Sequence, residues 1–390
     1  MNSTIPSCRP PRHAAAPPRP SRRPVRGTVA ALAALAAAGC AAGDPPLDRT
    51  APAPVTESPA AVATPGTDGR PGAGVEVTMA RGNWATGYLQ AAIFRALLTE
   101  LGYTVTDPAD AELPPTDFYP ALAEGTYDFW ANGWFPNHAE YIQAEDPEAD
   151  LPEGTVVADH VSRVGTQMAH GGLQGFLVDK KTADELGIVS MADIAANPAP
   201  WDSDGDGLAE VAGCDEGWLC QVIIDEIIAV NGWEDTVEQV SGAYNDLWAT
   251  QIARLERNEP VLAYTWTPSA YIVQLVPGRN AYWLSVPRTV VGQDAAAALP
   301  ESQCPSQPCT MGFRPADVSV VANNEFLAAN PAAAELFERV TIDVVDVALQ
   351  NVRYRGGENS AADIAAHAAA WIVDNRDRVD VWLAAARAAR

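Results

Sequence analysis

Tryptophan recurs in three short segments of this sequence, which contains eleven tryptophans in all. Trp134 lies in Asn-Gly-Trp-Phe-Pro-Asn-His at 132–138, Trp218 in Gly-Cys-Asp-Glu-Gly-Trp-Leu-Cys at 213–220, and Trp266 in Tyr-Thr-Trp-Thr-Pro at 264–268. Each tryptophan lies at the end of an expected strand, next to an expected helix start, or close to a glycine or proline, and these are the places where α/β sheets bind ligands. A single tryptophan is more often a packing residue. Several indole faces around one pocket, however, can hold a cation that has no N–H to donate.

An acidic loop is a second group that could do chemistry. Asp202, Asp204 and Asp206 occupy positions 1, 3 and 5 of a segment with glycine at position 6, and Glu210 is ninth. This pattern is the start of a calcium loop. The twelfth position is Gly213, so the usual bidentate glutamate is missing. The loop therefore predicts either a structural Ca²⁺ site or a solvated Asp/Gly turn, and otherwise no cofactor is expected.

Four cysteines form two close pairs, Cys214 with Cys220 and Cys304 with Cys309. An even number of cysteines in an exported chain favours disulfides. The alternative is a metal site with four thiolate ligands. The spacings are looser than the Cys-x2-Cys that is typical of such sites, so we expect two disulfides, each closing a short loop.

The N-terminal 74 residues indicate export rather than a fold. Residues 1–39 carry six arginines and no acid, followed by a short apolar stretch and small residues, which is the pattern of a signal peptide. Cys40 directly follows, as in a bacterial lipobox, so we expect lipidation of Cys40; an ordinary signal peptide with an incidental cysteine is the alternative. Residues 40–74 are rich in proline and have no aromatic residue, which predicts a disordered tether.

Composition excludes several classes of protein. The formal net charge is −25, and Lys180 and Lys181 are the only lysines, so a nucleic-acid binder is not expected. Downstream of position 40 the apolar runs are shorter than the roughly 18 residues of a transmembrane helix. Hydrophobic residues make up 47% of the chain, which is enough for a folded core.

The elements that would position these segments alternate between strands and helices. Apolar residues at helical spacing predict a helix over 86–101, ending at Gly102. Further helices are expected over 117–124, 182–186, 220–231, 244–257, 331–350 and 364–375, and strands over 75–79, 103–106, 127–134, 175–178, 260–265 and 318–321. This alternation predicts an α/β architecture with mainly parallel sheets, and the length suggests two of them.

The three tryptophan segments, in this order, resemble those of the glycine-betaine-binding proteins of bacterial ABC osmoprotectant importers. The resemblance runs from about 102 to 382. It also includes Asp-Lys-Lys-Thr-Ala-Asp at 179–184, Asp-x-Asp-Gly-Asp-Gly at 202–207, Val-Pro-Gly-Arg at 276–279 and Asn-Pro-Ala-Ala-Ala at 330–334. It implies a two-lobed periplasmic-binding-protein fold of type II. Each lobe would be a mainly parallel sheet flanked by helices, and a two-segment hinge would join residues 75–172 and 318–390 to residues 173–317.

The resemblance also implies roles for individual residues. Trp134, Trp218 and Trp266 would surround the quaternary ammonium group. His138 and the backbone N–H groups of Leu219 and Cys220 would hold the ligand carboxylate, and a helix beginning near Cys220 would aim free N–H groups at an anion. Without the resemblance, His138 could equally be a surface residue that caps the next helix.

Because of two departures from the family pattern, the sequence predicts more than one possible ligand. The family has a small residue where this chain has Leu219, which would narrow the carboxylate end. Trp84 precedes the first helix and matches related choline and betaine binders, so it is a candidate fourth wall, and choline-like or carnitine-like ligands remain alternatives. His138 favours a ligand with a carboxylate, because choline has none.

The sequence therefore predicts an exported binding protein without catalysis, on the outer face of the membrane or in the periplasm. It would deliver its small ligand to a membrane permease, and the lipid on Cys40 would hold it at the membrane. The alternative from a different class is a secreted Ca²⁺-dependent adhesion or carbohydrate-binding protein that uses the Asp202–Glu210 loop. A hydrolase is not expected, because Gly-x-Ser-x-Gly, His-Glu-x-x-His and a phosphate loop are absent from the sequence.

Overall fold

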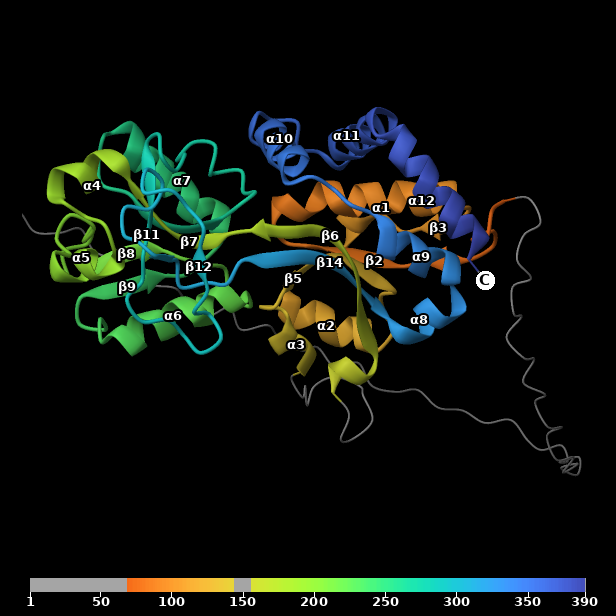
Figure 1. Ribbon diagram of the computed structural model, residues 1–390, viewed down its shortest axis with the longest axis horizontal. Coiled ribbons are helices and arrows are strands. Elements are labelled where there is room, and N and C mark those ends of the chain that lie inside the picture. Colours follow the sequence, from red (N-terminus) through yellow and green to blue (C-terminus); the bar gives the residue numbers. More distant parts are fainter. Residues whose placement is uncertain (1–68, 144–155, 390) are drawn as a thin grey trace, which may run out of the picture. The chain divides into compact units, whose positions relative to one another are not determined.

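Two five-stranded sheets organise the chain in the computed structural model, which describes residues 69–143 and 156–389 (Figure 1). The strand order of the first sheet is β4 (Glu112–Leu113), β2 (Met79–Gly82), β5 (Phe129–Phe135), β14 (Ala316–Asn323) and β6 (Val161–Gly172). The strand order of the second is β11 (Ala281–Leu284), β7 (Gln174–Asp179), β10 (Leu262–Trp266), β8 (Ala209–Ala212) and β9 (Val237–Val240). We call the parts built on these sheets lobe 1 and lobe 2.

The chain changes sheet twice, between β6 and β7 and again before β14, next to the boundaries expected from the sequence. Two short pairs of strands lie outside these sheets: β1 (Glu76–Val77) pairs with β3 (Thr104–Val105), and β12 (Ala296–Ala297) pairs with β13 (Cys309–Thr310). The two-lobed α/β architecture is thus the predicted one.

Each sheet is mixed rather than mainly parallel. In lobe 1, β2 pairs in parallel with β4 and β5, whereas β14 pairs antiparallel with β5 and β6. In lobe 2, β8 pairs in parallel with β9 and β10, whereas β7 pairs antiparallel with β10 and β11. The antiparallel half of each sheet contains the strands next to the two crossings, since β6, β7 and β14 adjoin them.

Helices cover both sheets. Those of lobe 1 are α1 (Tyr88–Glu100), α2 (Pro115–Ala123), α3 (Ala139–Gln143), α8 (Asn324–Ala329), α9 (Pro331–Arg339), α10 (Val344–Arg355), α11 (Ala361–Asp374) and α12 (Arg376–Ala388). Those of lobe 2 are α4 (Lys180–Leu186), α5 (Met191–Ala196), α6 (Leu219–Asn231) and α7 (Tyr244–Glu256). Single turns of 3₁₀ helix are η1 (Ala85–Gly87), η2 (Pro108–Asp110) and η3 (Val157–Asp159). Figure 1 shows α1 and α2 on opposite sides of the first sheet.

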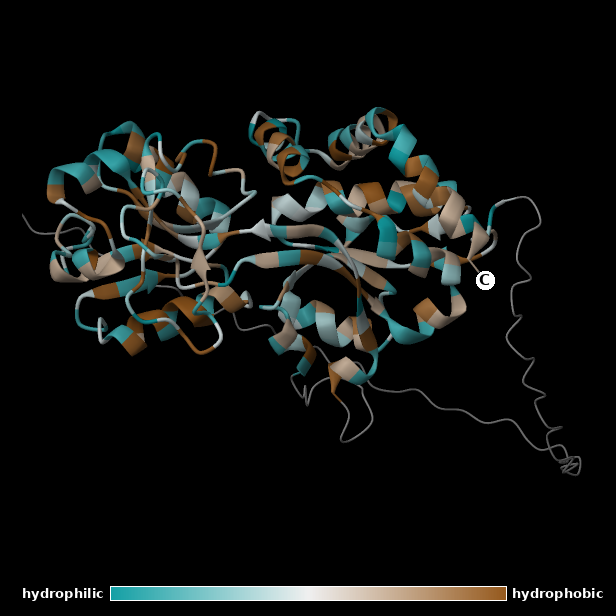
Figure 2. Cartoon of the chain, viewed as in Figure 1, coloured by the Kyte–Doolittle hydropathy of each residue, from teal (hydrophilic) through white to brown (hydrophobic). Residues whose placement is uncertain are grey.

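Helix α1 shows why these segments are helical. Leu89, Ile93, Leu97 and Leu101 recur at helical spacing, as predicted, and all four are buried. The helix packs on β5 and on α11. Hydrophobic and hydrophilic residues alternate along most helices in Figure 2, as amphipathic surface helices require.

The predicted helix over 331–350 is wrong, because two helices occupy this region. Val340 leaves the helical conformation, with φ −64° and ψ 125°, and α10 begins only after Asp343. Between them the N–H of Ile342 donates to the carbonyl of Gln167 in β6, at 2.8 Å. A β-branched run is stiff in a helix, and here it bonds to the edge of the sheet instead.

The described residues also include a folded segment before the predicted position 75. Residues 71–74 form a turn, and the N–H of Gly72 donates to the carbonyl of Leu101 at 3.1 Å. Gly72 lies so close to Tyr103 that a side chain in its place would collide with the ring. Glycine therefore lets the chain pack where composition alone predicted a tether. The signal peptide and Cys40 lie outside the described residues.

Candidate functional site

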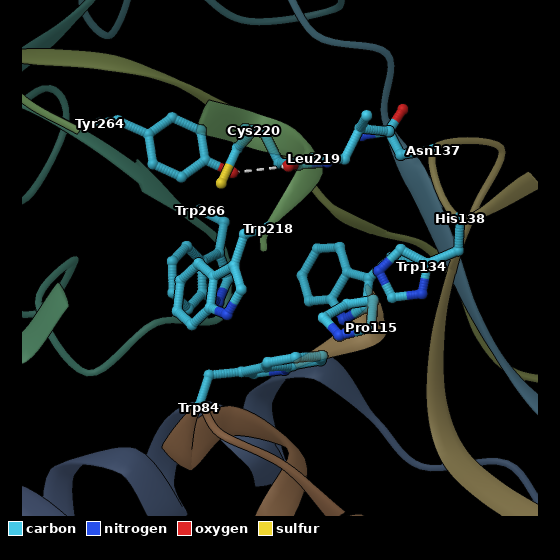
Figure 3. A pocket seen from close by; sticks show the side chains of 11 residues that line it. Trp84, Pro115, Trp134, Asn137, His138, Trp218, Leu219, Cys220, Tyr264 and Trp266 are labelled. Atoms are coloured by element: carbon cyan, nitrogen blue, oxygen red, sulfur yellow. Dashed lines mark hydrogen bonds between the residues drawn. The ribbon is translucent and has the colours of Figure 1, made fainter. Parts of the chain in front are cut away.

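Four tryptophans from both lobes line one cavity of about 60 Å³ (Figure 3). Trp84 lies just before η1 and Trp134 is in β5, both in lobe 1. Trp218 is the N-cap residue of α6, and Trp266 is the last residue of β10, both in lobe 2. The structure thus brings together the three predicted cage residues and places Trp84 as a fourth wall. The cavity is small beside the roughly 300–1,000 Å³ of drug-sized sites, so it suits a compact ligand.

The indole rings meet edge to face. Trp84 and Trp218 have ring centroids 5.6 Å apart at 78°, Trp218 and Trp266 are 5.7 Å apart at 71°, and Trp134 and Trp266 are 6.4 Å apart at 79°. Each side chain is at most 8% exposed. This arrangement turns ring faces in different directions around one small space, which is the geometry that a desolvated cation needs.

All four indole N–H groups are already satisfied by the protein. Asn132 accepts from both Trp84 and Trp134, each at 2.8 Å. Trp218 donates to Asn83 at 2.8 Å, and Trp266 donates to Thr86 at 3.2 Å. The cage therefore presents π faces rather than hydrogen-bond donors, which suits an alkylated ammonium group better than one that needs polar partners. Sequence reasoning missed these acceptors, because they lie up to 180 positions from the tryptophans that they orient.

His138 lines the same cavity and is uncharged at neutral pH. Burial lowers the pKa of His138 to about 3. Its Nδ1 atom is 2.9 Å from the hydroxyl of Tyr119, whose pKa burial raises well above its usual value. A protonated tyrosine that donates to Nδ1 leaves the single ring proton on Nε2. His138 then offers a neutral N–H donor rather than a positive charge.

The N-terminus of α6 contributes the backbone donors. Leu219 and Cys220 are its first two residues and line the cavity, with N–H groups that have no acceptor one turn earlier in the helix. The Tyr141 hydroxyl donates to the carbonyl of Gly217 at 3.2 Å and also contacts the N–H of Leu219, so it steadies this turn. The Cys214–Cys220 disulfide closes the same turn, as predicted. The end of the helix thus places partial positive charge against the cavity.

Four lining residues were missed by sequence reasoning: Pro115, Asn137, Gln174 and Tyr264. Two of them adjoin predicted residues, since Asn137 precedes His138 and Tyr264 is two positions from Trp266 on the same face of β10. The alternation of a strand could have identified Tyr264. Gln174 carried no such signal, because only the pairing of β7 with β10 brings it opposite Trp266.

Charged side chains are absent from the cavity wall in the part of the chain that the structure describes. None of the eleven lining residues is Asp, Glu, Lys or Arg. With His138 neutral, the wall has an aromatic region and a region of neutral donors. In Figure 3 the dashed line from the hydroxyl of Tyr264 marks its hydrogen bond to Oε1 of Gln174, and Trp84 lies on the far side of the other indole rings. An occupant with no net charge but separated charges fits this division.

The two lobes contact each other beside the cavity. Asn351 of α10 and Thr86 both donate to the carbonyl of Pro268, the latter at 3.2 Å. Gln293 of lobe 2 donates to Asn137 of lobe 1 at 3.2 Å. Together with the Trp218 and Trp266 bonds to lobe 1, these contacts hold the lobes together over the site.

The acidic loop lies apart from this cavity. Asp202, Asp204 and Asp206 place one carboxylate oxygen each within 4.8 Å of one another. Glu210 instead accepts from the hydroxyl of Ser203, and Asp202 accepts from the N–H of Gly205 at 2.6 Å. The calcium site therefore stays a prediction. The second predicted disulfide, Cys304–Cys309, is present and also lies outside the cavity.

Within the described residues, none of the helices is both long and apolar enough to cross a membrane. The predicted lipid anchor on Cys40 lies outside that range.

Comparisons with known proteins agree with the site. The glycine betaine-binding periplasmic protein OusX of Dickeya dadantii is 33% identical over 83% of this chain and 93% of its own length. The glycine betaine/proline betaine-binding periplasmic protein of Escherichia coli is 31% identical over 82% of this chain and 92% of its own length. A solved choline-binding protein of an ABC transporter, in complex with choline, has the same fold, with a TM-score of 0.59 at 17% identity, covering 80% of this chain and 97% of that one.

The sequence pattern of the family described as the substrate binding domain of ABC-type glycine betaine transport systems matches residues 75–374. This range includes every tryptophan of the cage, His138 and the start of α6. The chain belongs to this family of ABC-transporter substrate-binding proteins.

Proposed function

We propose that the cavity binds glycine betaine or a close relative that also joins a quaternary ammonium group to a carboxylate. The observation that carries this proposal is the division of an uncharged wall into four indole faces and a set of neutral donors. The ammonium group would lie against Trp84, Trp134, Trp218 and Trp266, each close contact contributing about 1–2 kcal/mol. The carboxylate would accept from His138 and from the backbone N–H groups at the start of α6.

Choline is the less favoured ligand, although Trp84 is a fourth aromatic wall. Choline carries a net positive charge, and the described cavity wall has no carboxylate to balance it. It also has no carboxylate to use the donors at the start of α6, which would leave them desolvated without a partner. A zwitterion satisfies both ends.

Membership of the family supports a physiological role in transport. We propose that the loaded protein delivers its ligand to a membrane permease without transforming it. The curated relatives named above are periplasmic proteins, which supports export of this chain. A signal peptide over residues 1–39 and a lipid on Cys40 would place it at the outer face of the cytoplasmic membrane, as the sequence pattern suggests.

Calorimetry with a panel of ligands tests this proposal. Glycine betaine and proline betaine should bind, with choline weaker and ectoine weakest, and binding should change tryptophan fluorescence because the rings form the wall. Failure of all betaines to bind would overturn the proposed function. Loss of binding on chelation, with no effect of betaine on the melting temperature, would instead favour the Ca²⁺-dependent adhesion protein.

Tryptophan variants test the placement of the cation. Replacing Trp134, Trp218 or Trp266 by alanine should weaken betaine binding by about 10-fold or more, the equivalent of one desolvated cation–π contact. Trp371→Ala is the matched control, because Trp371 is also buried but lies in α11 and donates to Asp346. Equal losses of affinity in all four variants would contradict the cage.

A further inference from the structure

Gln174 is a buried polar residue of the cavity wall with no assigned role. It is the first residue of β7 and only 6% exposed. In the antiparallel pairing of β7 with β10 it lies opposite Trp266. Residues paired across strands point to the same face of a sheet. Gln174, Trp266 and Tyr264 therefore share the face of lobe 2 that lines the cavity.

Tyr264 fixes the orientation of the Gln174 amide. The Tyr264 hydroxyl is 2.6 Å from Oε1 of Gln174. Burial raises the pKa of Tyr264 far above its ordinary value, so the hydroxyl stays protonated and donates. A hydroxyl proton needs an acceptor, and an amide offers one only at its oxygen. The Gln174 Nε2 atom must then point away from Tyr264.

Nε2 of Gln174 is buried and has no hydrogen-bond partner among the residues that the structure describes. Of the eleven residues described in the cavity wall, Gln174 is the one with a buried side-chain atom that lacks a hydrogen bond. Most buried polar atoms in proteins are paired, and leaving one unpaired is costly. An unpaired donor at the wall of a ligand cavity indicates an acceptor on the ligand. The neighbouring α6 N-terminus is the other donor group of lobe 2 in this wall.

We infer that the Gln174 Nε2–H group donates to the ligand carboxylate, held in place by Tyr264, and so selects betaines over choline. This inference rests on the proposed function and deepens it by naming a residue that reads the oxygen end of the ligand. A second prediction comes with it. Tyr264 acts as a positioning residue, because it touches the amide oxygen while Nε2 faces the ligand.

The experiment compares glycine betaine with choline by calorimetry on the full chain and its variants. Gln174→Leu should weaken betaine binding by about 10- to 100-fold, the range for a hydrogen bond to a charged group, with choline affinity changed less than 3-fold. Gln174→Glu should weaken betaine further, because two carboxylates would face each other, and should bring choline affinity up. Tyr264→Phe should cause a smaller loss of affinity for betaine than Gln174→Leu does, and almost no loss for choline. In this variant the Gln174 amide is still present, and only the hydrogen bond that orients it is lost.

Gln251→Leu is the matched control, since Gln251 is a buried glutamine of lobe 2 on α7 that does not line the cavity. This variant should leave the affinities for betaine and choline unchanged. Its thermal unfolding, followed by circular dichroism, measures how much stability is lost when a buried amide is removed. Equal betaine affinity of wild type and Gln174→Leu would overturn the inference while leaving the proposed function intact. Equal losses for betaine and choline would also overturn it. A wild type that binds no betaine would instead overturn the proposed function.

Discussion

At the scale of single residues, the site depends on groups that are neutral because they are buried. His138 and Tyr119 form a hydrogen-bonded pair, and burial disfavours the charged form of each. The sequence predicted His138 through its motif, but not Tyr119. The 19 positions between the two residues carry no pattern that predicts their contact. A sequence motif does not predict the hydrogen-bond partners of a histidine, and these partners determine which ring nitrogen carries the proton.

The first prediction at this scale concerns pH. The pKa of His138 falls from 6.5 to about 3 on folding, so between these values the unfolded chain binds a proton that the folded chain does not. Lowering the pH through this window must therefore cost stability, by about 1.4 kcal/mol per pH unit for one proton. His138→Gln should remove that contribution, so urea denaturation at pH 7 and pH 5 should show a smaller difference in the variant than in wild type.

The control for this measurement is Gln251→Leu, which replaces a buried side chain that does not titrate. The difference between the two pH values should be the same in this variant as in wild type. If His138→Gln kept the full wild-type difference, His138 would be protonated in the folded protein, and its role as a neutral donor would be wrong.

At the scale of elements, the two disulfides close loops of similar length but lie at different positions relative to the cavity. Cys214–Cys220 closes the turn that begins α6, and Cys304–Cys309 closes a loop away from the cavity. Both pairings were predictable from the spacing of the cysteines and from the export that the sequence suggests. Their different relation to the site was clear only from the position of α6 in the cavity wall.

These bridges offer a matched pair of variants. Replacing both cysteines of either bridge by serine should lower the free energy of unfolding by about 2 kcal/mol, because each closes a short loop. Only Cys214→Ser with Cys220→Ser should also weaken betaine binding, by several-fold, because the backbone donors of α6 would no longer be held in place before binding. Calorimetry and urea denaturation measure both quantities. A similar loss of affinity for the two bridges would show that the turn is not pre-organised by its disulfide.

The elements also show where sequence patterns fail. Helix α1 was predictable because its buried apolar residues recur about once per helical turn and so form one face of the helix. The break between α9 and α10 was not, because Ile342 pairs with Gln167, far away in the chain. The antiparallel pairing of β6, β7 and β14 was not predictable either, because the partners of these strands also lie far away in the chain. Local propensity competes there with tertiary pairing, and the pairing wins.

At the scale of the whole molecule, the orientation of two cage rings depends on contacts between the lobes. Trp218 and Trp266 belong to lobe 2, but their N–H groups bond to Asn83 and Thr86 of lobe 1. Thr86 also donates to the carbonyl of Pro268, so one hydroxyl contacts lobe 2 twice. In an open form these indoles would lose the acceptors that orient them. A ligand that needs all four rings would therefore bind the closed form best, which is the differential affinity that drives closure.

Asn83→Ala tests this coupling. Removing the acceptor of Trp218 costs one hydrogen bond between lobes, which is equivalent to an affinity loss of about 5- to 10-fold for glycine betaine. The loss should come mainly from faster dissociation in stopped-flow tryptophan fluorescence, because the bond forms only once the lobes have closed. Asn245→Ala is the control, since Asn245 accepts from Tyr271 within lobe 2 at 2.7 Å. If Asn83→Ala slowed association and left dissociation unchanged, the bond would form before closure, and orientation of the cage would not depend on it.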